Sequence, residues 1–254
     1  METKETNTSD GGTRFYRGIF ARFRSLGGWF RRLLLYLLGM FVLAFGVAIA
    51  VKSDLGITPV NSIAFAASRI FSIDHGLMTA IVYCGYVLIQ LAILRKEFHP
   101  SGFLQIAVAM LFGLFVSLCN HILSFPTPEI YWVRILLMLV SVVIIAIGIL
   151  LYLRANLLPQ PAEGLMLAIQ KKTGWKLHNI KIFFDFIVVS FAAALSLITV
   201  QKIIGVREGT LIAMLGVGKV MGFLSGPLGK KIDGIFRLNT EERQPQSTST
   251  LPSE

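Results

Sequence analysis

The stretch KSDLGITPVNSIAFAASRIF, residues 52–71, organises the chain because its pattern returns as RANLLPQPAEGLMLAIQKKT, residues 154–173. Each copy follows an apolar run, begins with a basic residue and has a proline at its eighth position. The shift of 102 residues between the copies also carries Gly46 onto Gly148. Proline is favoured at the first position of a helix, where its missing N–H costs no hydrogen bond. The sequence therefore predicts two repeats, each with an apolar helix, a polar break and a short helix that begins at proline.

The composition indicates a membrane protein. Hydrophobic residues make up 54% of the chain and charged residues only 15%, and the mean hydropathy is +0.70. A soluble domain carries more charge than this. The net charge of +10 would favour nucleic acid in a soluble chain, but these basic residues lie beside apolar runs, where lipid headgroups attract them. We therefore expect the lipid bilayer as a partner and no nucleic acid.

Six apolar stretches are long enough, or nearly so, to cross the bilayer, which takes about 20 residues of helix. They are residues 30–51, 77–94, 102–123, 131–153, 182–199 and 209–226. Most are apolar on every face, so hydrophobic periodicity cannot assign their packing. The predicted fold is an all-α polytopic membrane helical bundle, with membrane repeats over residues 30–123 and 131–228.

The segments outside the two repeats are polar or basic. Residues 1–13 are polar and are predicted to be disordered. Residues 14–29 alternate arginine with Phe15, Ile19 and Phe23 at helical spacing, which predicts a basic amphipathic helix on the membrane surface. Either it only sets orientation or it recognises particular lipids. No cleavable signal is predicted, and residues 229–254 are expected to form a cytoplasmic tail.

The distribution of basic residues predicts the orientation in the membrane. With a cytoplasmic N-terminus, 18 of the 24 Lys and Arg residues lie inside and five lie outside, as the positive-inside rule requires. Both termini are then cytoplasmic, and the chain is expected to cross the membrane several times. Residues 59–71 and 161–173 reach only about 20 Å at 1.5 Å per residue, so we expect re-entrant or interfacial half-helices. Three full spans per repeat make the two repeats inverted.

The two half-helices are the first candidate site. Their free N–H groups and helix dipoles favour an anion or carboxylate in front of Pro59 and Pro161. The alternative is a pair of ordinary helix caps at the headgroup level, with Asn61 and Glu163 satisfying their own first-turn amides. Two copies in matched positions leave both interpretations open, and in a shared site Asp54 and Asn156 would also contribute.

Charged residues within the spans are the second candidate feature, because they are costly in lipid. Lys219 lies near the middle of the last span, so it is expected to face a protein cavity as a counter-charge or coupling group. Lys181 and Asp185 are four residues apart and share a helix face. They form either a neutralising pair or a proton or ion relay.

Several other features have simple interpretations. Gly218, Gly222 and Gly226 recur at four-residue spacing, which lets a helix of this chain or of a second protomer approach closely. The two cysteines lie in apolar runs, and the four histidines show no metal-ligand spacing. No nucleophile elbow, Walker loop or zinc motif is present. We therefore expect no catalytic residues, no metal, no cofactor and no enzyme activity.

Four motifs resemble one protein family. They are L-G-x-x-P at 55–59, P-x-E-G-L-M-x-A-I-x-x-x-T-G at 161–174, K-x-x-x-D at 181–185 and G-V-R-E-G-T-L at 205–211. Together they resemble the YczE/YyaS/YitT group of bacterial membrane proteins over residues 35–228. In that group an acidic residue often stands where this chain has Asn61, and the last span is usually neutral where this chain has Lys219. The resemblance implies a bacterial plasma-membrane protein and no particular substrate.

These observations predict a small transporter or permease for a small solute, with an anion as the expected guest. The predicted substrate-binding residues are Asp54, Pro59, Asn61, Asn156, Pro161, Glu163, Asp185 and Lys219. The alternative is a non-transport accessory or regulatory scaffold for another membrane complex, which would use the glycine-rich last span and the basic N-terminal helix.

Overall fold

The computed structural model of this protein describes residues 26–235, and within this range the chain is helical with no strand. The helices are α2 (Leu26–Ser53), α3 (Pro59–Phe71), α4 (His75–Leu94), η2 (Arg95–Glu97), η3 (Pro100–Phe103), α5 (Leu104–Ile122), α6 (Tyr131–Ala155), α7 (Pro161–Thr173), α8 (Leu177–Val200), α9 (Glu208–Ser225) and α10 (Pro227–Ile235). The predicted disordered segment and most of the predicted amphipathic helix lie outside this range.

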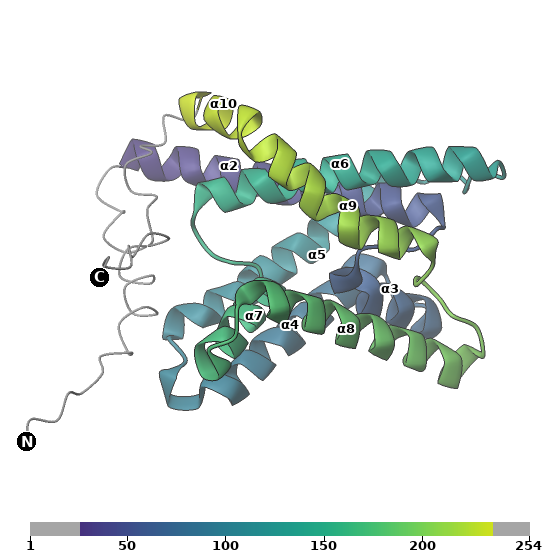
Figure 1. Ribbon diagram of the computed structural model, residues 1–254, viewed down its shortest axis with the longest axis horizontal. Coiled ribbons are helices and arrows are strands. Elements are labelled where there is room, and N and C mark those ends of the chain that lie inside the picture. Colours follow the sequence, from purple (N-terminus) through teal and green to yellow (C-terminus); the bar gives the residue numbers. More distant parts are fainter. Residues whose placement is uncertain (1–25, 236–254) are drawn as a thin grey trace, which may run out of the picture.

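Six of these helices are long and apolar enough to cross a membrane, which confirms the predicted all-α membrane bundle. They are α2, α4, α5, α6, α8 and α9; α2 and α6 run along the long axis of the molecule, and α4, α5 and α9 are inclined to it (Figure 1). A short helix, α10, begins at Pro227 directly after α9 and covers the start of the predicted tail, most of which lies outside the described residues. Proline is well placed there, since it can start a helix but cannot continue one.

The sequence repeat is also a repeat of secondary structure. Helices α3 and α7 both begin at proline, after residues with extended backbone, and both end at a left-handed residue, Ser72 and Gly174. The residues Asp54 and Asn156 that follow α2 and α6 are left-handed as well. All these positions differ by 102, as do the first residues of α4 and α8, whereas α5 and α9 begin 104 residues apart.

Helices α2 and α6 pack side by side and antiparallel (Figure 1). A Cβ on Gly46 would come within 2.7 Å of Ile145, and a Cβ on Gly148 within 2.5 Å of the Leu43 backbone. Because Leu43 and Ile145 are themselves 102 residues apart, each helix places the same glycine against the same position of its partner. The paired glycines of the sequence are therefore the close-approach points of the first spans.

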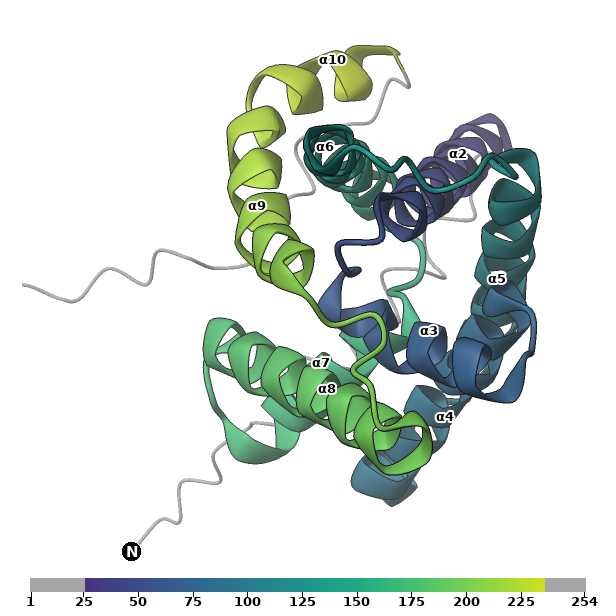
Figure 2. The ribbon, with the colours of Figure 1, turned by 90° about the vertical axis from the view of Figure 1, so that its right-hand side faces the viewer.

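Two further pairs of contacts are equivalent in the two repeats. Helix α3 packs on α8 and α7 packs on α4, while α5 packs on α2 and α9 packs on α6. The exception is the pair that ends each repeat. Helix α4 packs along α5, but α8 makes no comparable contact with α9, as the end-on view shows (Figure 2).

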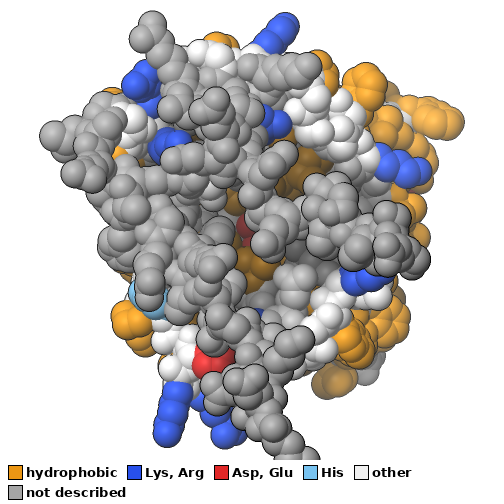
Figure 3. All heavy atoms as spheres, turned by 60° about the vertical axis from the view of Figure 1, so that its left-hand side comes forward, with side chains coloured by type: hydrophobic (Ala, Val, Ile, Leu, Met, Phe, Trp, Pro, Cys, Tyr) orange, Lys and Arg blue, Asp and Glu red, His pale blue; other side chains and the backbone are white. Residues whose placement is uncertain are grey.

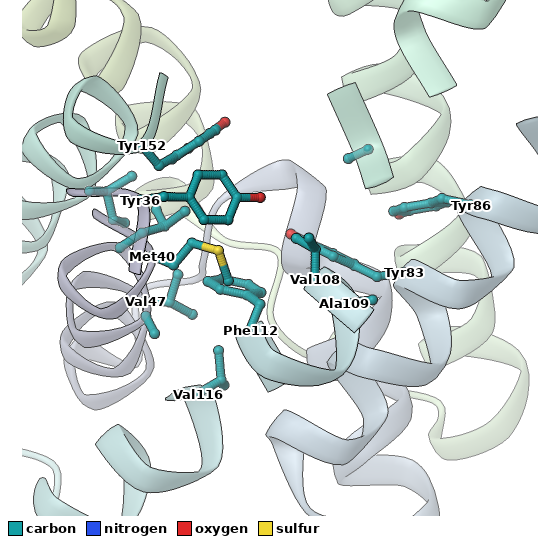
Figure 4. Close-up of a cluster of buried hydrophobic side chains, with 14 of the residues drawn as sticks. Tyr36, Met40, Val47, Tyr83, Tyr86, Val108, Ala109, Phe112, Val116 and Tyr152 are labelled. Atoms are coloured by element: carbon teal, nitrogen blue, oxygen red, sulfur yellow. The ribbon is translucent and has the colours of Figure 1, made fainter. Parts of the chain in front are cut away.

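The core lies where α2, α4, α5 and α6 meet. Figure 4 shows its aromatic part, in which Tyr83 of α4 stacks on Phe112 of α5 with ring centroids 5.6 Å apart. Tyr36 of α2 meets Tyr152 of α6 edge to face at 6.2 Å. Both pairs are almost fully buried, so their rings fix the spacing of the helices that carry them.

Candidate functional site

The first turns of both half-helices line one pocket of about 580 Å³. Thr58, Pro59, Val60 and Asn61 come from the start of α3, and Gln160, Ala162 and Glu163 from the start of α7. Apolar side chains of α2, α6 and α9 supply most of the remaining wall, and Tyr83, Lys181 and Asp185 reach it from α4 and α8. The volume is that of a small-molecule site, and a few polar groups in an apolar wall are its usual composition.

Glu163 occupies the positive end of α7. It is the third residue of the helix, where a carboxylate interacts favourably with the dipole. Its carboxylate accepts a hydrogen bond from the backbone N–H of Gln160 and another from the hydroxyl of Tyr152. This is one half of a capping box, so the alternative of self-satisfied first-turn amides applies to α7.

Three tyrosines lie near this carboxylate. Tyr152 donates a hydrogen bond to Glu163, Tyr36 and Tyr83 lie close enough to be influenced by its charge, and Figure 4 shows the three extending from α2, α4 and α6 toward a common region. The Tyr36 hydroxyl also donates to the Leu158 carbonyl at 3.1 Å, which holds the α6–α7 loop. Their hydroxyl groups were not predicted from the sequence, because tyrosine in an apolar span is also an ordinary core residue.

Asn61 occupies the corresponding place in α3. Its amide Nδ2 donates to Thr58 Oγ1 at 3.0 Å, and its Oδ1 accepts from the Tyr83 hydroxyl at 3.1 Å. Gln90 Nε2 ties α4 to the start of α7, donating to the Pro161 carbonyl and to Gln105 Oε1, both at 2.9 Å. The sequence did carry a signal for Gln90 and Gln105, since each is an amide at the edge of an apolar span.

The pair Lys181 and Asp185 lies on the wall of the same pocket. Lys181 Nζ is 2.9 Å from Asp185 Oδ2, as their four-residue spacing predicts. The Lys181 side chain is 53% exposed, whereas that of Asp185 is 3% exposed. Among the described residues, Asp185 Oδ1 and the Nε2 of Gln160 are buried without a hydrogen-bond partner. Both residues line the pocket, so one buried acceptor and one buried donor beside it are unused.

Five predicted site residues line the pocket, namely Pro59, Asn61, Asn156, Glu163 and Asp185. Pro161 adjoins it and contributes its carbonyl to Gln90. Asp54 lies elsewhere, at the end of α2, where it pairs with Arg134 at 3.3 Å and Arg207 at 3.6 Å. Because α2 and α6 are antiparallel, their last residues lie at opposite ends of the bundle, so Asp54 cannot share a site with Asn156.

Lys219 is the second predicted residue outside the pocket. Helix α9 presents Ala213, Met214, Val217, Gly218 and Met221 to the pocket. Those positions recur at three- and four-residue intervals, and Lys219, about 100° around the helix from Gly218, is exposed instead. Its neighbours Gly218, Gly222 and Gly226 also have no atom within 4 Å of an added Cβ. No described helix packs closely on them, so a contact with a second protomer stays a prediction.

The two ends of the bundle differ in how they are closed. At the end of α2, the Ile57 N–H donates to the Gly205 carbonyl at 3.2 Å and the Gly209 N–H to the Leu55 carbonyl at 2.8 Å. Leu55 and Ile57 are fully buried there. Within residues 26–235, the equivalent loop 156–160 makes no backbone hydrogen bond to the segment between α4 and α5.

Ion pairs at that less closed end join α7 to η2. Glu97 pairs with Lys171 at 3.1 Å and with Lys172. Figure 3, which brings this end forward, shows Lys and Arg side chains at several points of the rim. In the described part of the chain, no three His, Cys, Asp or Glu side chains are placed to hold a metal ion.

Comparisons with known proteins extend these findings. A family model described as "Family of unknown function (DUF6198)" matches residues 30–226. The chain is 30% identical over 148 residues to the "Uncharacterized membrane protein YczE" of Bacillus subtilis (strain 168), covering 58% of this chain and 66% of that protein. No solved structure matches. The predicted YczE-like resemblance is confirmed, and the likeness to YitT stays a prediction.

Proposed function

We propose that this chain, which belongs to the DUF6198 family of unknown function, is a small transporter or permease. Its solute site is the pocket in front of Pro59 and at the start of α7. The observation that carries this proposal is that two half-helices 102 residues apart both begin at one pocket. Interrupted helices that meet at a repeat interface are how many secondary transporters build their substrate sites.

The packing supports inverted repeats. Helices α2 and α6 are antiparallel and make reciprocal glycine contacts through Gly46 and Gly148. Helices α3 and α7 exchange partners in the same way, with α8 and α4. In a transporter of this kind, one repeat rocks against the other and exposes a fixed site to alternate sides of the membrane.

The difference between the two ends supports an inward-open state. The end closed by Ile57 and Gly205 belongs to the loops that carry few basic residues. The pocket instead reaches residues 153–160 at the other end, whose loops are rich in Lys and Arg and are cytoplasmic by the positive-inside rule. The protein would then sit in the bacterial plasma membrane with cytoplasmic termini and with its pocket open inward.

Cysteine labelling from each side of the membrane tests the proposal. In a background without Cys84 and Cys119, single cysteines replace Val60 and Leu157 in the pocket wall and Ile57 in the closed end. A transporter allows membrane-impermeant maleimide to reach Val60→Cys from both sides. Ile198→Cys is the control, because that side chain is 82% exposed on the outer surface of α8 and should stay in lipid. Labelling of Val60→Cys from one side only would contradict alternating access.

An accessory or regulatory scaffold is the second candidate, and α9 favours it. Gly222 and Gly226 have nothing within 4 Å of an added Cβ and, unlike Gly218, do not line the pocket, so they leave room for a helix of another membrane protein. One-sided labelling of the pocket, together with loss of a copurifying partner in Gly222→Leu, would support this role instead.

A further inference from the structure

We propose that the pocket takes a monovalent organic cation with an apolar body, such as an alkyl- or arylammonium ion. This inference rests on the proposed function, since it names the solute class of the same site. Four features of the described residues lead to it.

The first is the formal charge of the pocket. Its wall carries two carboxyl groups, Glu163 and Asp185, and one ammonium group, Lys181. Lys181 is already paired with Asp185, so one negative charge is left without a basic partner in the wall. An uncompensated charge in the membrane interior is costly, and a guest with one positive charge removes it.

The second is the unused acceptor. Asp185 Oδ1 is buried and accepts no hydrogen bond within residues 26–235, although the carboxylate lies on the pocket wall. A buried carboxylate oxygen is stabilised strongly by an N–H donor with a positive charge. Lys181 supplies one such donor to Oδ2, and a guest ammonium would supply the other.

The third is the nature of the walls. Leu43, Ile145, Ile149, Met166 and Val217 give the pocket an apolar surface, which accommodates an alkyl chain or ring. Tyr83 and Tyr152 also line it, and aromatic faces attract cations. A small hydrated inorganic ion would not use these walls.

The fourth is that, at the start of α7, the feature favouring an anion is already used; the start of α3 has no acidic residue in its first turn. The dipole at the start of α7 is compensated by the Glu163 carboxylate, which accepts from the Gln160 N–H and the Tyr152 hydroxyl. An anionic guest would lie beside this carboxylate and be repelled. At the start of α7 this arrangement favours a cation over the anion that the sequence predicts.

The test compares matched probes on the full-length protein purified in detergent. Primary alkyl- and arylammonium ions of increasing length are compared with carboxylates of the same carbon skeletons, by calorimetry and by thermal shift. We expect the ammonium series to bind, more tightly as the apolar body grows, and to raise the melting temperature. Tighter binding of the carboxylates, or no binding by either series, would overturn the proposal.

Variants identify the groups that bind. Asp185→Asn and Glu163→Gln should each weaken ammonium binding about tenfold or more, as expected for the loss of a charge-assisted hydrogen bond. Glu129→Gln is the matched control, because it removes an exposed carboxyl between α5 and α6. Full affinity in both pocket variants would overturn the proposal.

If the Asp185 and Glu163 variants do not fold, a labelling experiment on a milder variant tests the same proposal. Met214→Cys lies on the pocket wall, and the ammonium probe should slow its labelling by maleimide while the carboxylate probe does not. If the ammonium probe protects Met214→Cys from maleimide but Val60→Cys is labelled from one side only, the cation site is supported and the transport proposal is contradicted. If Val60→Cys is labelled from both sides but the carboxylate probes bind more tightly than the ammonium probes, transport is supported and the cation proposal is contradicted.

Discussion

The two repeats share the same order of helices but carry different side chains at equivalent positions. In the first repeat, α4 and α5 meet at Gly76 and Gly113, and Tyr83 stacks on Phe112. The equivalent positions of the second repeat carry His178 and Val217, and Asp185 and Gly216. There α8 and α9 separate, and the pocket lies along both helices. The comparison teaches that the hollow arises because the second repeat lacks the glycine contact and the paired rings that close the first.

The largest expected effect comes from breaking the closed repeat. In Gly76→Leu the new Cβ would collide with the carbonyl oxygen of Gly113 and with Ser117, so α4 and α5 must separate. Overpacking of this kind should cost about 3 kcal/mol of stability, measured as a loss of thermally resistant protein in detergent. Gly222→Leu is the control, because nothing lies within 4 Å of its Cβ. Equal melting temperatures of the two variants would contradict the role given to the glycine contact between α4 and α5.

A smaller effect is expected from removing the charge that is unique to the second repeat. Thr79 and Tyr83 stand where that repeat has Lys181 and Asp185. Lys181→Met leaves the buried Asp185 carboxylate without its partner, which is destabilising. Because Lys181 is 53% exposed, solvent screens the pair, and the expected loss of folding stability is about 2 kcal/mol, below that for a fully buried pair. The double variant Lys181→Met with Asp185→Asn should recover most of it, and no recovery would show that Lys181 acts through packing alone.

The smallest effect concerns the helix starts. Asp74 caps α4 by accepting the Leu77 N–H at 2.8 Å, whereas Lys176 at the equivalent start of α8 makes no side-chain cap. Asp74→Ala should therefore cost about 1 kcal/mol, and Lys176→Asp should gain up to about that amount. Thermal melting of the two variants measures both changes. A loss of stability in Lys176→Asp would mean that the second repeat does not use this position as a cap.

The Asp74 cap also carries a pH dependence. Burial by itself would raise the pKa of this carboxyl, but hydrogen bonds from Ser117 and from the Leu77 N–H hold the pKa below its usual range. The stability it contributes is then present above the unfolded pKa and is lost as the pH falls through the lowered, folded pKa. Asp74→Ala should abolish that part of the acid sensitivity, as melting curves at a series of acidic pH values would reveal.

Several parts of the candidate site could be predicted because they depend on local chemistry. Prolines 59 and 161 start helices since their backbone geometry suits that position, and Lys181 and Asp185 meet because they are one turn apart. The placement of Asp54 and Lys219 could not be predicted. The position of Asp54 depends on the antiparallel packing of α2 and α6. The position of Lys219 depends on which face of α9 lines the pocket.

The sequence by itself determined the membrane class, the six spans, the repeat and the starts of both half-helices. The length of an apolar run and the backbone geometry of proline are properties of a single segment. Tertiary structure alone decided that both half-helices open on one pocket, that three tyrosines lie near Glu163 and that, among the described helices, α8 and α9 do not pack together as α4 and α5 do. The physical reason is that most spans are apolar on every face. Which face meets a neighbour then depends on where glycines allow backbones to approach, a property of helix pairs that one segment does not encode.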